Sequence, residues 1–181
     1  MKFKILSLIL LLSYSIAGVA QADKSYNILD QFIASGYMGD TEKIIVKKNV
    51  VDNARPDSAC TKITYTPGGK GWGGVYWQYP ENNWCIQKGK DFSTANYTKI
   101  TFYARGEKGG EEVRFKVGQD CGDSFVSDEL VEKLPKTWKK FTIDLTGKDL
   151  SNITGAFCWI ADSKATEGII TFFLDDVHLE K

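Results

Sequence analysis

Aromatic and amide side chains gather in one segment of the chain, GWGGVYWQYPENNW, which runs from Gly71 to Trp84. Its 14 residues hold five aromatic rings, including three of the chain's five tryptophans. A Trp or Tyr ring can pack flat against the C–H groups of a sugar ring, and amides such as those of Gln78, Asn82 and Asn83 can bond its hydroxyls. The chemistry available to this segment is therefore sugar recognition. The same rings could instead belong to a hydrophobic core, where large rings usually lie.

Alternation along the predicted strand divides this aromatic segment between two faces. Neighbouring side chains in a strand point to opposite sides of the sheet. On that rule Trp77 and Tyr79 face a core, whereas Tyr76 and Gln78 point outward. Trp72 is flanked by glycines, so a ligand could approach its indole ring closely.

Four further residues complete the predicted contact surface. Trp84 lies in a turn-like stretch and could cap a sugar site or pack its own loop, and the side on which Trp159 lies stays open. Arg105 and Lys116 point outward by alternation and could bond sugar hydroxyls or a uronic carboxylate, or simply keep the surface soluble. The candidate ligand-binding residues are Trp72, Tyr76, Gln78, Trp84, Arg105, Lys116 and Trp159.

The elements that must position these residues are strands. Short runs rich in Val, Ile, Thr, Tyr and Phe alternate with Gly, Asn, Asp and Pro, which is typical of strands and turns. The expected strands are Lys43–Lys48, Cys60–Thr66, Gly74–Tyr79, Lys99–Arg105, Glu112–Gly118, Lys139–Leu145, Gly155–Ala161 and Ile169–Glu180, with a first strand near Ile28–Ile33. No long helical period appears. The pattern predicts an all-β, antiparallel β-sandwich of the jelly-roll type, formed by a single domain.

The N-terminal segment has the features of a secretory signal peptide. Two lysines precede an apolar run from Ile5 to Val19, and Ala20-Gln21-Ala22 supplies small residues for cleavage. We therefore expect a signal peptide over residues 1–22 and a mature domain over residues 23–181. The apolar run is shorter than the roughly 20 residues that span a membrane, so we expect a secreted or periplasmic protein without a membrane partner.

The charge balance restricts the class of partner. Lysine and arginine number 23, as do aspartate and glutamate, so the formal charge is 0 and becomes −2 when the predicted signal peptide is removed with its two lysines. Nucleic acids and anionic membranes demand a strongly basic surface. We therefore expect no nucleic-acid partner, and a monomer that binds a poly- or oligosaccharide.

The four cysteines suggest a disulfide framework. An even number in an exported chain is compatible with up to two disulfides. Cys85 and Cys121 lie in polar, glycine-containing segments, and we favour a bond between them that joins two loops. Cys60 and Cys158 lie beside strand-like runs and are either paired or free and buried. A zinc site is disfavoured because no CxxC spacing occurs and His178 is the one histidine.

Several segments, in their order along the chain, resemble a group of secreted bacterial domains. The segments are SGYMGD (35–40), ACTKITYTP (59–67), GWGGVYWQYPENNW (71–84), ITFYARGEKGGEEVRFKVG (100–118), WKKFTIDLTGKDLSN (138–152), GAFCWIAD (155–162) and FFLDDVHLE (172–180). They are similar to carbohydrate-binding modules of the galactose-binding-domain-like jelly-roll superfamily. The resemblance implies the fold and a non-catalytic sugar-binding role that requires no cofactor. It implies the fold more securely than the ligand, because one fold hosts many functions.

The same resemblance raises the question of calcium. Many modules of that superfamily hold a structural calcium ion between the first strand region and an acidic pair near the last strand. Asp175 and Asp176 match the acidic pair, whereas Ile33 stands where the family often has an acidic residue. Asp30 or Asp40 could supply further oxygens to a possible structural calcium. Alternatively, the acidic pair bonds turn amides or protects a strand edge.

Two other classes of function stay open. A hydrolase would need two carboxylates at a suitable distance, and the acidic residues Asp120, Asp123, Asp128 and Glu129 are close in sequence but typical of a solvated loop. A lyase would need a base such as the Gln-x-His segment of jelly-roll alginate lyases, which this chain lacks. A protein-binding adhesion or interaction module would also expose an aromatic patch. The expected function is non-catalytic carbohydrate binding.

Overall fold

The computed structural model describes residues 25–56 and 58–181, so the predicted signal peptide lies outside the described residues. Short strands make up most of the regular structure. In chain order the elements are β1 (Tyr26–Asn27), α1 (Ile28–Gln31), β2 (Ile33–Gly39), the 3-10 helix η1 (Thr41–Lys43), β3 (Ile44–Val50), β4 (Cys60–Tyr65), β5 (Trp72–Gln78), β6 (Lys99–Gly106), β7 (Glu112–Lys116), β8 (Leu130–Lys133), β9 (Lys139–Asp144), β10 (Gly155–Asp162) and β11 (Ile170–Glu180).

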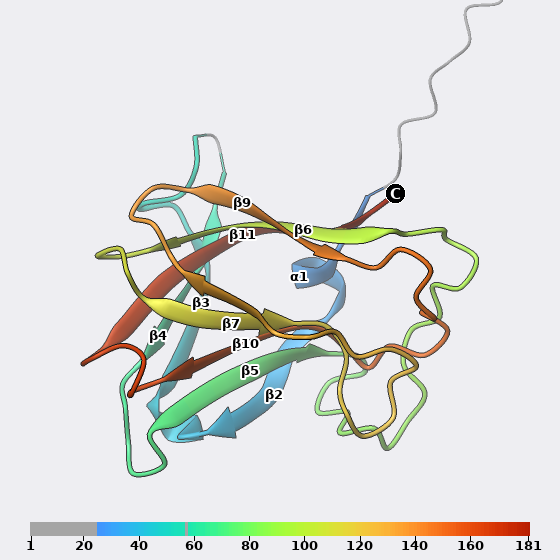
Figure 1. The fold of residues 1–181 in the computed structure, drawn as a ribbon, viewed down its shortest axis with the longest axis horizontal. Coiled ribbons are helices and arrows are strands. Elements are labelled where there is room, and N and C mark those ends of the chain that lie inside the picture. The colour runs from blue at the N-terminus through green and yellow to red at the C-terminus, as the bar shows by residue number, and fades with distance from the viewer. Residues whose placement is uncertain (1–24, 57) are drawn as a thin grey trace, which may run out of the picture.

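Two sheets pack face to face. Sheet A has the order β3-β4-β11-β6-β9, with β1 added beside β11, and sheet B has the order β2-β5-β10-β7-β8. Every strand pairing in the described residues is antiparallel. Figure 1 shows the two layers, with β6, β9 and β11 above β5, β7 and β10. The expected antiparallel jelly-roll sandwich is confirmed.

The core lies between the sheets and is built by strand alternation. The predicted inward residues of β5, β6, β7 and β9 are buried, Trp77, Phe102 and Phe115 completely so. Aromatic rings from the two sheets interlock at its centre, where the Phe102 ring of sheet A lies 4.8 Å from the Phe115 ring and 5.0 Å from the Phe157 ring of sheet B. These contacts bury a large apolar area and hold the layers together.

The predicted first strand is wrong in its position. Residues Ile28–Gln31 form the short helix α1, and the strand β2 begins only at Ile33. The side chain of Asn27 caps this helix by accepting a hydrogen bond from the backbone N–H of Leu29 at 3.0 Å. An N-terminal cap is a local signal that favours a helical turn over an extended chain.

Tyr79 is also misplaced by the sequence prediction. The strand β5 ends at Gln78, and Tyr79 is 37% exposed instead of buried in the core. Its backbone N–H bonds the carbonyl of Thr154 at 2.8 Å, outside the strand ladder. Alternation applies only within a strand, so it fails one residue beyond the end of β5.

The predicted disulfide between Cys85 and Cys121 is confirmed. Cys85 and Cys121 form a disulfide with a Cα–Cα distance of 5.8 Å, and it joins the loop after β5 to the loop after β7. Cys60 and Cys158 are free and buried. The alternative in which these two pair is wrong, because Cys60 of β4 and Cys158 of β10 each keep a free thiol.

Among the described residues, none of the helices has the length and apolar character needed to cross a membrane.

Candidate functional site

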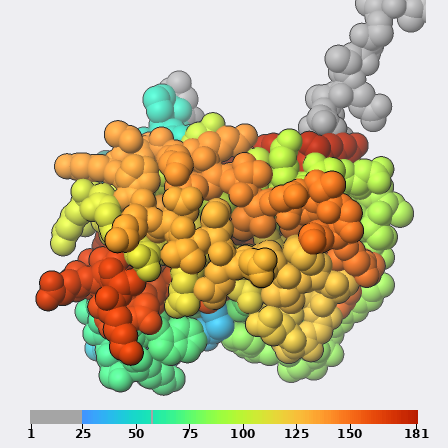
Figure 2. Space-filling view, viewed as in Figure 1, coloured from blue at the N-terminus to red at the C-terminus, as the bar shows by residue number. Residues whose placement is uncertain are grey.

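The outward side chains of sheet B form the surface on which most of the predicted residues meet. We call this surface the sheet B face; its residues are Gly36 and Met38 of β2, Trp72, Gly74, Tyr76 and Gln78 of β5, Cys158, Ile160 and Asp162 of β10, Arg114 and Lys116 of β7, and Val131 of β8. Figure 2 shows the surface hollowed between the green lobe of the β4–β5 turn and the golden lobe of the loop after β7, with β2 visible between them.

The middle of the sheet B face is an apolar strip. Met38, Gly74, Ile160 and Arg114 are cross-strand neighbours in one row. A Cβ atom on Gly74 would lie 3.1 Å from Met38 Cε and 3.2 Å from Ile160 Cγ1, so these two side chains close over the glycine. The glycine therefore makes room for its neighbours, and Met38 and Ile160 provide a low, partly exposed floor.

Trp72 lies at one end of this floor. Its indole is partly exposed and rests on Gly39 of β2, where a Cβ atom would lie 3.0 Å from Trp72 Cδ2. Gly39 also adopts a φ of +68°, which few other residues tolerate. The close approach of β2 thus sets the position of the Trp72 ring, and Asp162 is its cross-strand neighbour on β10.

Trp84 is the most exposed tryptophan that borders the sheet B face. It is 42% exposed, whereas Tyr76 beside it is only 5% exposed. The two rings meet edge to face, with centroids 6.4 Å apart and an interplanar angle of 86°. Tyr76 points outward from the sheet as predicted, but it serves as the support behind Trp84. Burial raises the pKa of the Tyr76 phenol, which keeps this support uncharged.

Gln78 is completely buried and holds the loop that carries Trp84. Its Oε1 accepts a hydrogen bond from Ser35 Oγ at 2.9 Å, and its Nε2 donates to the Asn83 carbonyl at 3.1 Å and to Gln119 Oε1 at 2.9 Å. Gln119 Nε2 in turn donates to the Asn83 carbonyl at 2.9 Å and to Thr154 Oγ1 at 2.7 Å. A buried, fully bonded amide presents no surface to a ligand, so Gln78 lies outside the contact surface that we propose below.

The loop that carries Trp84 is fixed by its own polar contacts. Asn83 Nδ2 donates to the carbonyls of Tyr79 and Gln87 at 3.0 and 2.9 Å, and its Oδ1 accepts from the backbone N–H groups of Ile86 and Gln87 at 3.0 Å each. The disulfide at Cys85 follows directly after Trp84. A ring held in place before binding loses less conformational entropy when a ligand arrives.

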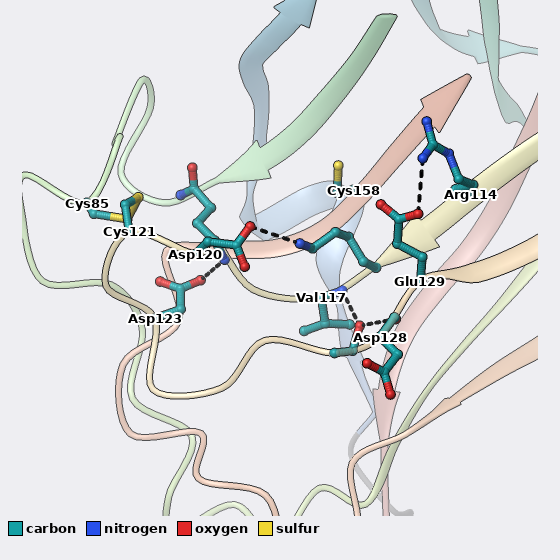
Figure 3. Close-up of polar contacts among 12 residues, drawn as sticks. Cys85, Arg114, Val117, Asp120, Cys121, Asp123, Asp128, Glu129 and Cys158 are labelled. Carbon is teal, nitrogen blue, oxygen red and sulfur yellow. Dashed lines mark hydrogen bonds and ion pairs between the residues drawn. A yellow bond between two sulfur atoms is a disulfide. The ribbon is translucent and has the colours of Figure 1, made fainter. Parts of the chain in front are cut away.

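Two cations, Lys116 and Arg114, stand on β7 at the far side of the sheet B face, and Figure 3 shows Arg114 with its partner Glu129. The Lys116 side chain is only 10% exposed, and its Nζ lies 3.2 Å from Asp120 Oδ2. Arg114 Nη1 lies 3.2 Å from Glu129 Oε2. Both carboxylates come from the segment between β7 and β8. Arg114 was not among the candidate residues, although alternation placed it outward beside Lys116.

Arg105 and Trp159 lie away from the sheet B face. Arg105 belongs to β6 of sheet A, where its guanidinium carbon lies 4.2 Å from the centroid of the Phe173 ring and 5.7 Å from that of the Trp138 ring. Trp159 is completely buried in the core, with its ring centroid 5.3 Å from that of Phe172. Five of the seven predicted residues therefore lie on or beside one face, and these two do not.

The acidic pair near the C-terminus shares one arginine within the chain. Asp175 Oδ2 lies 3.1 Å from Arg55 Nε and accepts a hydrogen bond from Ser58 Oγ at 3.0 Å, and Asp176 bonds the same guanidinium. The guanidinium carbon lies 3.9 Å from the centroid of the Tyr103 ring. These carboxylates already have a cationic partner, so they do not fit the set of six to eight oxygens that calcium requires.

The remaining candidate calcium ligands are also engaged elsewhere or isolated. Asp30 is exposed on α1. Asp40 accepts hydrogen bonds from the backbone N–H groups of Gly68, Lys70 and Gly71 and from the Tyr65 hydroxyl. Among residues 25–56 and 58–181, no group of three or more histidine, cysteine, aspartate or glutamate residues is placed to hold a metal ion.

Three of the four acidic residues considered for hydrolysis serve separate contacts. Asp120 and Glu129 pair with the two β7 cations. Asp123 accepts hydrogen bonds from the backbone N–H groups of Gln119, Thr154 and Gly155 at 2.7–3.0 Å, and so fastens the loop after β7 to β10. A hollow of about 460 Å3 nearby lies between the edge strands β8 and β9, lined by residues 125–130, 142–144 and 148, and it contains none of the predicted ligand-binding residues.

Known proteins resemble this chain in fold and not closely in sequence. No protein-family model matches the chain, and no curated protein matches it. A family 11 carbohydrate-binding module from Clostridium thermocellum, solved in complex with a β-1,3-1,4-mixed-linked tetrasaccharide, matches with a TM-score of 0.59 and 15% identity over 87% of this chain and 95% of that chain.

Two further solved structures give the same result. A family 30 module of a cellulosomal cellulase from Clostridium thermocellum matches with a TM-score of 0.54 and 12% identity over 88% of this chain and 94% of that chain. The CBM22-1 xylan-binding domain from Paenibacillus barcinonensis matches with a TM-score of 0.50 and 14% identity over 87% of this chain and 92% of that chain. The chain thus has the jelly-roll sandwich fold of these carbohydrate-binding modules.

Proposed function

We propose that the chain is a secreted, non-catalytic carbohydrate-binding protein that holds a poly- or oligosaccharide on the sheet B face as a monomer. The observation that carries this proposal is the pair of partly exposed rings beside the sheet B face: Trp72 at the start of β5, and Trp84 against Tyr76 farther along the same strand. The jelly-roll fold shared with carbohydrate-binding modules supports it, and the Cys85–Cys121 disulfide suits an oxidising compartment.

The spacing of the rings favours an oligosaccharide over a single sugar. Trp72 and Tyr76 are four residues apart on β5, which corresponds to about 13 Å along a strand. Trp84 stands against Tyr76, so the two exposed rings are separated by a comparable length of floor. Each stacking contact contributes on the order of 1 kcal/mol, so two rings with polar contacts predict micromolar to millimolar affinity.

The first prediction concerns Trp84. In titration calorimetry against soluble β-glucans and xylans, we expect the purified protein to bind at least one polymer and Trp84→Ala to weaken that binding about tenfold, which is about 1.4 kcal/mol. The thermal midpoint should change little, because Trp84 is 42% exposed. The matched control is Trp138→Ala, which removes a partly exposed ring on the sheet A side of the molecule. Equal losses in both variants, or no binding of any glycan by the parent protein, would contradict the proposal.

We infer the absence of catalysis from the way the acidic side chains are used. Asp120 and Glu129 neutralise cations and Asp123 bonds backbone amides, so none of the three stands opposite another as a free acid or base. The protein should therefore release neither reducing nor unsaturated ends from a polymer that it binds. Their steady appearance at high protein concentration would assign an enzyme to this scaffold instead.

A further inference from the structure

Two cations on one strand give the sheet B face a chemical preference. Arg114 and Lys116 are two residues apart on β7, so their side chains point to the same side of the sheet about 7 Å apart. Lys116 shares its cross-strand row with Cys158 and Tyr76, and Arg114 shares the next row with Ile160 and Gly74. Both cations therefore border the floor that lies between the rings.

Lys116 is not a solvated surface lysine. Its side chain is only 10% exposed, and an ammonium group carries three N–H donors. Its ammonium group pairs with the carboxylate of Asp120, whose own side chain is 79% exposed. Lysine is seldom buried to this degree unless an anionic group satisfies it. The pairing joins a nearly buried cation, which needs an anionic partner, to a mostly exposed carboxylate that is itself well solvated when another anion replaces it.

The anions that face these two cations come from a single segment. Asp120 and Glu129 both lie in the connection between β7 and β8, and Figure 3 shows them reaching back to the strand from that connection. A carboxylate is also the group that distinguishes a uronic acid from a neutral sugar. In the free protein, the segment thus places on each cation the same chemical group that an acidic polysaccharide would offer.

We infer that the sheet B face selects acidic polysaccharides, whose uronic carboxylates take the places of Asp120 and Glu129 on Lys116 and Arg114. This inference rests on the proposed function, since it assigns a ligand class to the same face. A neutral sugar could pack on the rings but would leave both internal ion pairs as they are. An acidic polymer can replace them with charge-assisted hydrogen bonds, and Arg114 can bind a carboxylate through two N–H groups.

The near-neutral charge of the chain is compatible with this selection. The formal net charge is 0 for the full sequence, so no strong overall field attracts a polyanion. Recognition would come instead from two cations at fixed positions beside the rings. Its dependence on salt should accordingly be moderate, since few ion pairs are exchanged.

The experiment compares one polymer with and without its carboxylates. Titration calorimetry would measure binding of the protein to polygalacturonate and to alginate, and to the same polymers after their carboxyl groups are reduced to primary alcohols. Because the backbone linkages are unchanged, the difference isolates the charge. We expect at least one acidic polymer to bind about tenfold more tightly than its reduced form. Equal affinities for both pairs would overturn the inference.

Variants assign the effect to the two cations. Lys116→Gln and Arg114→Gln should each abolish most of the preference for the acidic polymer over its reduced form. Asp120→Asn should strengthen acidic binding by about threefold, because the internal competitor is removed. Lys47→Gln, an exposed change on β3 of sheet A, is the matched control. Arg114→Gln keeps the test decisive if Lys116→Gln fails to fold, since the Arg114 side chain is partly exposed.

The outcomes separate the inference from the proposed function. Tight binding of neutral glycans with no preference for carboxylates overturns the inference and leaves sugar binding intact. A preference that survives both Lys116→Gln and Arg114→Gln also overturns it. Failure of the parent protein to bind any neutral, reduced or acidic polymer removes the proposed function itself.

Discussion

Tyr65 shows how one side chain can link the core to the edge of the sheet B face. Its ring is completely buried and its hydroxyl donates a hydrogen bond to Asp40 Oδ2 at 2.8 Å. The same carboxylate accepts backbone hydrogen bonds from Gly68 and Lys70 at 2.9 and 2.8 Å. The turn that leads into Trp72 is therefore tied to the core through a single tyrosine.

This tyrosine predicts a specific loss of stability in alkali. Desolvation, followed by the hydrogen bond to Asp40 and its negative charge, raises the pKa of Tyr65 from 10.0 to about 12. Because the pKa is higher in the folded chain, the contribution is fully present below pH 10 and is lost as the pH rises toward 12. The free energy of unfolding would be measured in urea at pH 8, 10 and 11. At pH 8, Tyr65→Phe should be less stable than the parent, because it lacks the hydrogen bond to Asp40. Between pH 8 and pH 11, its free energy of unfolding should then fall less than that of the parent. A parallel decline in both proteins would refute the assignment.

Single residues were also where the sequence prediction was weakest. Alternation correctly placed Tyr76 and Lys116 on the outward side of their strands, but it gave no measure of how deeply neighbouring loops cover them. Gln78 was expected to offer an amide to a sugar and instead spends every polar atom on Ser35, Asn83 and Gln119. Such coverage depends on segments far apart in the sequence, which strand periodicity does not report.

At the scale of elements, the loops after β5 and β7 act as one unit. Gln119 joins them by donating a hydrogen bond to the Asn83 carbonyl, and the disulfide between Cys85 and Cys121 joins them covalently. Together they carry Trp84 and Asp120, the most exposed ring beside the sheet B face and the most exposed of its ion-pair partners. The arrangement of the candidate site therefore depends on these two loops remaining joined.

The disulfide provides a test of this dependence. It closes a connection of 36 residues, and replacing both Cys85 and Cys121 by serine should destabilise the fold by about 2–4 kcal/mol in urea unfolding. Sugar affinity should fall as well, because Trp84 precedes Cys85 directly and would be held less firmly. The control is Cys60→Ser, a change of a free cysteine in β4 of sheet A. Unchanged sugar affinity in the double variant would show that the amide contacts alone position Trp84.

Most elements could be predicted from the sequence, and the exceptions have physical causes. Strands that alternate apolar and polar residues over six or more positions, such as β6 and β9, were placed within a residue or two. β8 was missed because its four residues are too short for a periodic pattern. α1 was taken for a strand because four residues of helix leave no period, so its cap at Asn27 was the one signal available.

At the scale of the whole molecule, alternation cannot say which sheet a strand joins. Arg105 and Lys116 have the same outward parity, but β6 pairs with β11 and β9 in sheet A while β7 pairs with β10 and β8 in sheet B. The two cations consequently lie on opposite surfaces of the sandwich. Long-range pairing decided this difference, and a single sequence carries little information about it.

The whole molecule also makes a prediction about metal ions. Arg55 lies in the connection between β3 and β4, far in sequence from β11. Its guanidinium forms ion pairs with both carboxylates of the acidic pair in β11. The thermal midpoint of the parent protein should therefore be the same in EDTA and in calcium. Arg55→Gln should lower stability by about 2 kcal/mol, because it leaves the nearly buried Asp175 without its cation. A midpoint that falls in EDTA and recovers with calcium would instead assign a metal to this pair.

The two free cysteines have a practical consequence for studying how this sandwich opens. Cys60 is buried in sheet A and Cys158 in sheet B, and neither thiol can react with a bulky reagent until its own surroundings open. Labelling rates at the two positions, read separately by peptide mass, would time the opening of the segments that cover the outer side of each sheet. Equal rates would mean that both coverings open in one cooperative event, and unequal rates would identify the covering that opens first. Each sheet of the native protein thus contains one free thiol whose labelling rate reports local opening.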